Sequence, residues 1–119
     1  MGQKKRKSSK QKQASSRTLL KRWSKAVRER DGNKCFVCGS TERVQAHHIC
    51  QKRMWKSLKY DLNNGISLCC KCHSFGKYSV HRGTDLLLIE KLLNERPAQY
   101  RHLLDKVHDE LEKKESADV

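Results

Sequence analysis

Apolar residues recur at helical spacing near the start of the chain. The first such stretch covers residues 17–30, and its apolar side is formed by Leu19, Leu20, Trp23, Ala26 and Val27. The Asp-Gly-Asn sequence at residues 31–33 is typical of a turn that ends a helix. The pattern predicts an amphipathic helix with its apolar side on a core and a basic remaining surface.

The C-terminal residues 84–119 show the helical period twice. An apolar run over residues 86–93 follows Thr84, a residue type that often caps helices. A second series begins at Pro97, and proline is well tolerated at the first helical position. Its apolar members are Tyr100, Leu103, Leu104, Val107 and Leu111. We predict two helices, acidic outside and apolar inside, that complete the core; a dimer or partner surface is the alternative.

Between these helices the apolar periods are short. Residues 44–49 alternate like a β-strand, residues 61–68 form a turn into a second strand, and a short helix runs from the second CxxC to about Tyr78. Successive side chains on a strand point to opposite faces, so His47 and His48 should have different roles.

These elements predict a small α+β protein with an N-terminal basic helix and two C-terminal helices. We expect a disordered basic tail over 1–16 and a single domain over 17–113. Within the domain, the core spans 31–83 and the C-terminal helical part spans 84–113. Residues 114–119 are expected to be a frayed tail.

The charge distribution changes this picture. The 119 residues include 27 Lys and Arg and 13 Asp and Glu, which gives a net charge of +14. Residues 1–30 hold twelve basic groups and one acidic group, whereas residues 84–119 are net acidic. This polarity favours a polyanion such as nucleic acid as partner, although a solvated basic tail is the alternative.

The chain has neither an apolar run long enough to span a membrane nor an apolar signal-peptide segment. We therefore expect a cytoplasmic protein that does not bind membranes. The basic residues 4–7 would act as a nuclear import signal only in a eukaryotic host.

Six cysteines in such a chain favour metal binding over disulfides. Two CxxC pairs are formed by Cys35, Cys38, Cys69 and Cys72. This spacing is typical of a structural zinc site, whose four ligands leave no open position for catalysis. Zinc would also compensate for the small core that a short chain can form. Cys50 and Cys70 are expected to be free, buried thiols.

The order of motifs over residues 35–73 resembles the HNH nuclease family, and most closely small phage or prophage HNH proteins. It comprises CxxC, Ala-His-His-Ile, Asn-Gly-Ile-Ser-Leu-Cys and CxxCH. The resemblance implies a ββα-metal (His-Me finger) core with two zinc knuckles. It also implies a metal-dependent endonuclease that hydrolyses DNA phosphodiester bonds and leaves 5′-phosphate and 3′-hydroxyl ends.

The same resemblance implies roles for individual residues. His48 matches the general base that activates water, and His47 and His73 match ligands of the catalytic divalent cation. Asn64 matches the residue that orients the base or assists the metal site, and His81 is an extra candidate. The cation would be Mg²⁺, Mn²⁺, Ni²⁺ or Zn²⁺, and the imidazole of His47 suits transition metals better than Mg²⁺.

Phosphate contacts are expected from basic residues between the strands and on the first helix. They are Lys52, Arg53, Lys56, Lys59, Lys21, Arg22 and Lys25. No motif typical of sequence reading is visible, so we expect nicking with low sequence specificity. The protein would act as a monomer or homodimer, with packaging, recombination or restriction proteins as further partners.

Two other functions are compatible with the cysteine pattern. In a non-catalytic zinc-ribbon module that binds nucleic acid, the histidines would be auxiliary ligands or surface residues. A zinc module for protein interaction is the other alternative. The combination of His47, His48 and Asn64 favours the nuclease, because a binding module does not need it.

Overall fold

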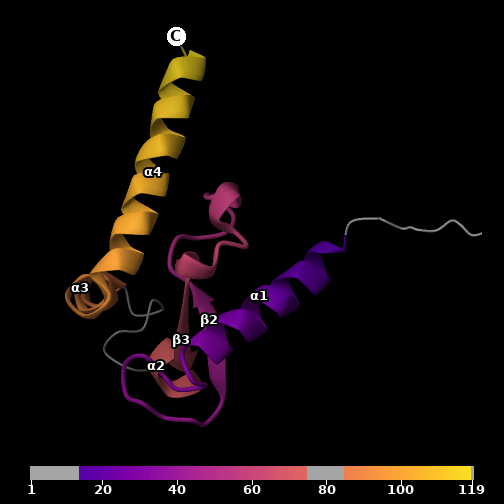
Figure 1. The fold of residues 1–119 in the computed structure, drawn as a ribbon, viewed down its shortest axis with the longest axis vertical. Helices are drawn as coiled ribbons and strands as arrows, with labels where there is room; N and C mark the ends of the chain where they lie inside the picture. The colour runs from indigo at the N-terminus through magenta and orange to yellow at the C-terminus, as the bar shows by residue number, and fades with distance from the viewer. Residues whose placement is uncertain (1–13, 75–84, 119) are drawn as a thin grey trace, which may run out of the picture.

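A computed structural model describes residues 14–74 and 85–118 (Figure 1). The elements in chain order are helix α1 (Ser16–Arg30), strand β2 (Val44–His48), the 3-10 helices η2 (Lys56–Leu58) and η3 (Leu62–Asn64), strand β3 (Gly65–Cys69), and the helices α2 (Cys70–Ser74), α3 (Asp85–Glu95) and α4 (Pro97–Asp118). The predicted small α+β fold is confirmed. Thr84, His81 and the proposed import signal at residues 4–7 lie outside the described residues.

Helix α1 ends at Arg30 as the sequence predicts, but it begins at Ser16 and uses Ser15 as its cap, two residues that the sequence assigns to the tail. The Ser15 hydroxyl caps its first turn by accepting a hydrogen bond from the Thr18 amide at 3.2 Å. After Arg30 the chain turns through Gly32 and Asn33, whose φ angles of 69° and 56° are left-handed. Trp23 and Val27 of the predicted apolar side are buried.

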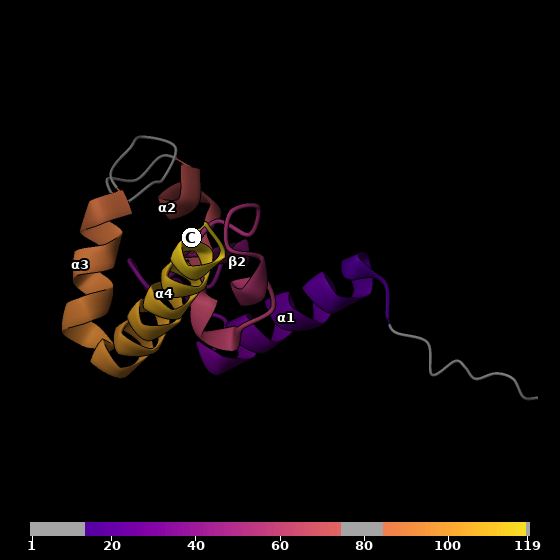
Figure 2. The same ribbon diagram turned by 90° about the horizontal axis from the view of Figure 1, so that it is seen from above.

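The two strands form an antiparallel sheet. In Figure 2, β2 lies between α1 on one side and α2 and α3 on the other. In its register His47 pairs with Ile66, and His48 pairs with Gly65. Ser67 is hydrogen-bonded to the Val27 carbonyl of α1, so Ser67 and Gly65 lie on the face of β3 that α1 covers. Ile66 and Leu68 lie on the other face and pack in the core with residues of α3.

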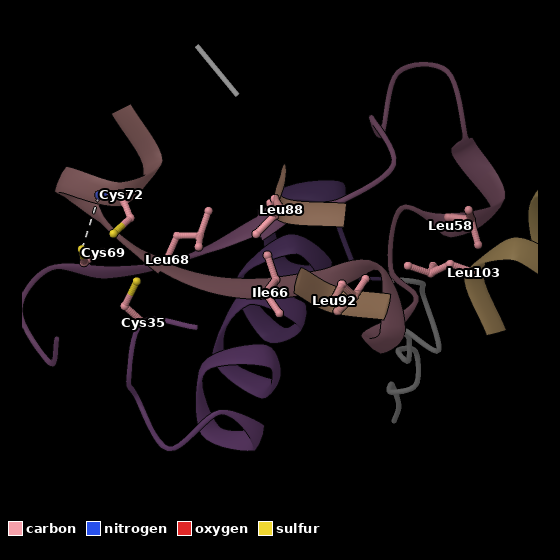
Figure 3. Close-up of a cluster of buried hydrophobic side chains, with 9 residues drawn as sticks. All are labelled: Cys35, Leu58, Ile66, Leu68, Cys69, Cys72, Leu88, Leu92 and Leu103. Atoms are coloured by element: carbon pink, nitrogen blue, oxygen red, sulfur yellow. Dashed lines mark hydrogen bonds between the residues drawn. The ribbon is translucent and has the colours of Figure 1, made fainter. Parts of the chain in front are cut away.

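The main core extends along this second face of β3 (Figure 3). Cysteines lie at one end, leucines from η2 and α4 lie at the other, and α3 contributes between them. Its buried members are Cys35, Leu58, Ile66, Leu68, Cys69, Cys72, Leu88, Leu92 and Leu103. The two C-terminal helices therefore complete the core, as predicted. Helix α4 continues to Asp118, where the sequence predicts a frayed tail over 114–119.

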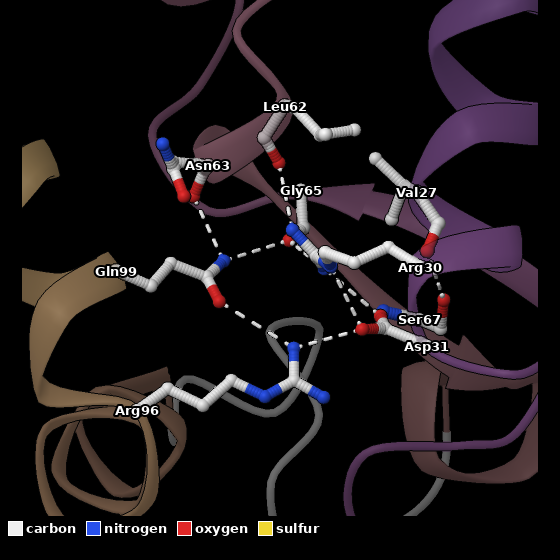
Figure 4. A network of polar contacts seen from close by, with 9 residues as sticks. All are labelled: Val27, Arg30, Asp31, Leu62, Asn63, Gly65, Ser67, Arg96 and Gln99. Atoms are coloured by element: carbon white, nitrogen blue, oxygen red, sulfur yellow. Dashed lines mark hydrogen bonds and ion pairs between the residues drawn. The ribbon is translucent and has the colours of Figure 1, made fainter.

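A partly buried polar network connects the end of α1 to β3 and α4 (Figure 4). The Asp31 carboxylate pairs with Arg30 at 2.9 Å and Arg96 at 2.8 Å, and it accepts a hydrogen bond from the Ser67 amide at 3.0 Å. Burial alone would raise the pKa of Asp31, but these hydrogen bonds and positive charges hold it below its usual value. From α4, the Gln99 side chain donates to the carbonyls of Asn63 and Gly65.

The expectation that Cys50 and Cys70 are buried is wrong, because both side chains are only partly buried. Cys50 follows β2 and lines the edge of an apolar hollow against α3 and α4. Cys70 lies at the start of α2 and lines an outer hollow beside Cys38. None of the helices in residues 14–74 and 85–118 combines the length and apolar character of a membrane span.

Gly65→Ala is expected to destabilise the protein by about 1–3 kcal/mol, the usual cost of overpacking. An added Cβ would lie 2.4 Å from Cγ2 of Val27 and 2.8 Å from Cζ2 of Trp23. Denaturant unfolding measures the loss. Because Val27→Ala removes the closest clashing atom, the double variant should lose less stability than the sum of the single variants. Strictly additive losses would contradict this packing.

Candidate active site and metal centre

Four cysteine side chains converge where the turn after α1 meets the end of β3 and the start of α2. The amide of Gly39 donates to the Cys35 carbonyl at 2.9 Å, which closes the first CxxC turn, and Gly39 itself has a φ of 78°. Cys69 ends β3 and Cys72 lies in α2. In this four-cysteine cluster, the Sγ atoms of Cys35, Cys38, Cys69 and Cys72 all lie within 4.8 Å of one another.

This arrangement fits a tetrahedral metal ion. Zinc–sulfur bonds of about 2.3 Å place tetrahedral ligands about 3.8 Å apart, and the Sγ atoms of Cys38 and Cys69 are 3.6 Å apart. Burial opposes ionisation of Cys35, but hydrogen bonds from backbone amides lower its pKa to about 7. Burial and the neighbouring thiols raise the pKa of Cys72 well above its usual value. A divalent cation supplies the positive charge that four thiolates need.

His47 and His73 form a second, smaller cluster. His47 comes from β2 and His73 from α2, and their ring centroids are 5.1 Å apart at an interplanar angle of 69°. Two imidazoles at this separation can offer nitrogen ligands to one divalent ion. Within the described part of the chain, only the four cysteines bring three or more ligand residues together.

His48 makes two well-defined contacts near the end of β2. Its ring stacks on the indole of Trp23 with centroids 3.8 Å apart and an interplanar angle of 10°. Its Nε2 is 2.9 Å from the carbonyl oxygen of Lys59. Because a carbonyl only accepts, Nε2 donates the hydrogen bond, and the neutral ring keeps its lone pair on Nδ1.

The electrostatic surroundings of His48 favour its neutral form. Burial lowers the pKa of His48, and the charges of Lys52 and Lys59 lower it further. The hydrogen bond to the Lys59 carbonyl opposes this effect without reversing it. The imidazole is therefore a proton acceptor at neutral pH.

The Asn64 side chain makes hydrogen bonds within the segment that connects β2 and β3. It is fully buried, and its Oδ1 accepts a hydrogen bond from the Cys50 amide at 2.7 Å. Its Nδ2 donates to the carbonyls of Cys50 and Leu58, each at 3.0 Å. Asn64 thus supports the segment that carries the Lys59 carbonyl, and its hydrogen bonds do not reach the His48 ring.

Asn64→Ala is expected to destabilise the protein by about 1–3 kcal/mol, because it leaves buried backbone groups of the connection without partners. Urea unfolding measures the loss. Asn63→Ala is a matched control, because the hydrogen bonds of Asn63 use its backbone amide and carbonyl. Equal losses for the two variants would show that the Asn64 side chain does not stabilise the connection.

The predicted phosphate contacts lie on the surface in two groups. In the connection between the strands, Lys52, Arg53 and Lys56 are exposed and Lys59 is partly buried. On α1, Lys21, Arg22 and Lys25 are exposed. Helix α1 also has an open hollow along one face, lined by Arg17, Leu20, Lys21, Ser24, Lys25 and Arg28.

This hollow adds Arg17, which sequence reasoning missed, and it includes Arg28 of the predicted basic helix surface. Arg17 and Arg28 lie on the same helix face as Lys21, because they are spaced by four and seven residues from it. Arg22 does not line the hollow. Helical spacing within the basic set would have identified this stripe, which we call the α1 basic stripe: Arg17, Lys21, Lys25 and Arg28.

The comparisons with known proteins agree with the motif pattern. Residues 35–75 match the family model described as HNH endonuclease. The resemblance seen in the sequence is confirmed for this segment, which is about a third of the chain, and the match suggests a nuclease-type function on nucleic acid. Neither the curated proteins nor the solved structures gave a match to the chain.

Proposed function

We propose that the protein is a metal-dependent DNA endonuclease in which His48 is the general base. The observation that carries this proposal is the state of the His48 ring. The Lys59 carbonyl holds Nε2–H, burial lowers the ring's pKa, and Nδ1 is the atom with the lone pair. A neutral imidazole with a defined basic nitrogen is suited to take a proton from water at physiological pH.

In the proposed reaction, His48 and the His47–His73 cluster have different roles. Nδ1 of His48 accepts a proton from the attacking water, while Nε2–H keeps its hydrogen bond to Lys59. The oxygen of that water forms the new bond to phosphorus, and the bond to the leaving 3′ oxygen breaks, as the family resemblance implies. The leaving oxygen takes a proton from bulk water to give the 3′-hydroxyl. His47 and His73 would hold a divalent cation, which when bound stabilises negative charge on the phosphate and the leaving oxygen.

The four-cysteine cluster has a structural role in this proposal. Four thiolates complete the coordination of zinc and leave no position for water or substrate. Three of the four cysteines belong to the buried core, so binding of the ion and formation of the core depend on each other. Catalysis is therefore assigned to the histidines of β2 and α2 and not to the four-cysteine cluster.

DNA binding in this proposal is directed at phosphates. The exposed cations of the connection and the α1 basic stripe are long, flexible side chains suited to backbone contacts, which carry no sequence information. We therefore propose nicking with low intrinsic sequence specificity. A cytoplasmic role in a bacterial or phage-infected cell, with DNA-processing proteins as partners, belongs to the same proposal.

The double variant Lys21→Gln with Lys25→Gln is expected to weaken duplex binding and flatten its salt dependence. Each lost phosphate contact reduces the slope of log K against log salt by about 0.9, so the slope should fall by about 1.8. Fluorescence anisotropy over a salt series measures it. Lys106→Gln with Lys113→Gln on α4 is the matched control. Equal slopes for both pairs would contradict a role of α1 in DNA binding.

Supercoiled plasmid provides the test of the proposed function. The zinc-loaded protein is incubated with plasmid and with Mg²⁺, Mn²⁺ or Ni²⁺ in turn. We expect open-circular product to form before linear product with at least one cation. Binding of the plasmid without nicking under all three would instead support the non-catalytic zinc-ribbon module.

A further inference from the structure

Trp23 of α1 lies outside the segment that matches the HNH family, yet it packs against the proposed base. Its side chain is 6% exposed, and its indole lies flat on the His48 ring. The family segment begins at Cys35, twelve residues after Trp23. The contact is therefore a feature of this chain's own N-terminal helix.

The register of the sheet makes room for the indole. Gly65 pairs with His48 across the two strands. A Cβ at Gly65 would lie 2.8 Å from Cζ2 of Trp23. The absence of a side chain at Gly65 is thus what allows Trp23 to lie beside the His48 ring.

Trp23 is itself held by a second contact. Its Nε1 donates a hydrogen bond to the carbonyl oxygen of Asp61 at 2.8 Å. The Asp61 carboxylate in turn accepts from the Asn63 amide at 2.9 Å and lies 2.7 Å from Nε2 of His102 on α4. The indole is therefore anchored to the same turn that α4 holds.

We propose that Trp23 is a positioning residue for His48. The hydrogen bond to Lys59 fixes the direction of Nε2, and the flat contact with Trp23 fixes the plane of the ring. Together they set the direction in which Nδ1 points. The inference rests on the proposed function of His48 as the base, and it assigns to α1 a part in catalysis as well as in packing.

Kinetics of three zinc-loaded variants test the proposal. A misplaced catalytic group can cost about 100-fold in rate, so Trp23→Leu is expected to lower kcat for nicking about 10-fold to 100-fold with KM within about twofold. Trp23→Phe keeps a ring that can stack and should recover most of kcat. Val27→Ala is the control, because Val27 is buried on the same side of α1; it should lower stability but leave kcat unchanged.

A spectroscopic readout tests the contact without relying on activity. The indole should shift the ring-proton NMR signals of His48 upfield from those of the exposed His108. This shift should be lost in Trp23→Leu and partly kept in Trp23→Phe. If wild-type protein shows the shift but does not nick DNA, the proposed function fails while the contact stands.

Two results would overturn the proposal. One is an unshifted His48 signal in the wild-type protein. The other is a folded Trp23→Leu whose kcat equals that of wild type, which would leave Trp23 with packing alone. If Trp23→Leu does not fold, Trp23→Met supplies the kinetic comparison, because an unbranched side chain fills irregular core space.

Discussion

Removal of zinc from the four-cysteine cluster is expected to unfold the protein. Apparent binding free energies of structural zinc are roughly 10–16 kcal/mol, whereas a whole domain is typically stable by only about 5–15 kcal/mol. Cys35, Cys69 and Cys72 are part of the buried core. Loss of the ion therefore leaves their thiolate charges unbalanced inside the core. The metal-free chain should therefore lack a stable core.

Cys69→Ser and Cys70→Ser separate the metal effect from a general effect of cysteine loss. Cys69 belongs to the cluster, whereas its neighbour Cys70 is partly buried and does not. We expect Cys69→Ser to lose bound zinc and helical circular dichroism, and Cys70→Ser to keep both. A chelated protein that contains no zinc but keeps its folded spectrum would contradict a structural role for the ion.

The helices and strands were predictable from local patterns, because each element repeats its apolar residues at a characteristic spacing. The helical period identified α1 and placed Trp23 and Val27 on its buried side. Pro97 correctly marked the start of α4. The two CxxC spacings identified the four-cysteine cluster, because each pair brings its two sulfurs close together.

Long-range polar contacts were not predictable in this way. Asp31 was interpreted as part of a turn that ends a helix, but its carboxylate binds Arg96, which is 65 residues away in the sequence. The link between His102 and Asp61 spans 41 residues. Such pairs have no local spacing rule, because only the folded chain brings the two partners together.

The candidate site, too, was predictable only where a local pattern existed. Strand alternation correctly separated His47 from His48: one ring meets His73 and the other meets Trp23. The sequence alone did not reveal the hydrogen bonds of Asn64 or the stack on Trp23. Both depend on where the connection after β2 and the helix α1 lie once the chain has folded.

His48→Ala is expected to lower the nicking rate about 100-fold to 10,000-fold, the usual contribution of a general base. The base works only when its ring is neutral, and burial lowers the pKa of His48 below 6.5. The rate should therefore be constant at neutral pH and fall only when the pH drops below 6.5. A pH–rate profile under saturating metal measures this fall in rate at acidic pH.

His108→Ala is the matched control, because His108 is an exposed histidine on α4. It should nick at the wild-type rate. Duplex affinity and bound zinc are measured for both variants, and neither quantity should change. A His48→Ala protein that had lost zinc would reveal a folding defect instead of a missing base.

The nicking rate of supercoiled plasmid by wild type, His48→Ala and His108→Ala, under the same cation, tests the central claim most directly. We predict that wild type and His108→Ala convert plasmid to the open-circular form at equal rates. His48→Ala should bind the plasmid but nick it at least about 100-fold more slowly. Nicking by His48→Ala at the wild-type rate would contradict the assignment of His48 as the general base.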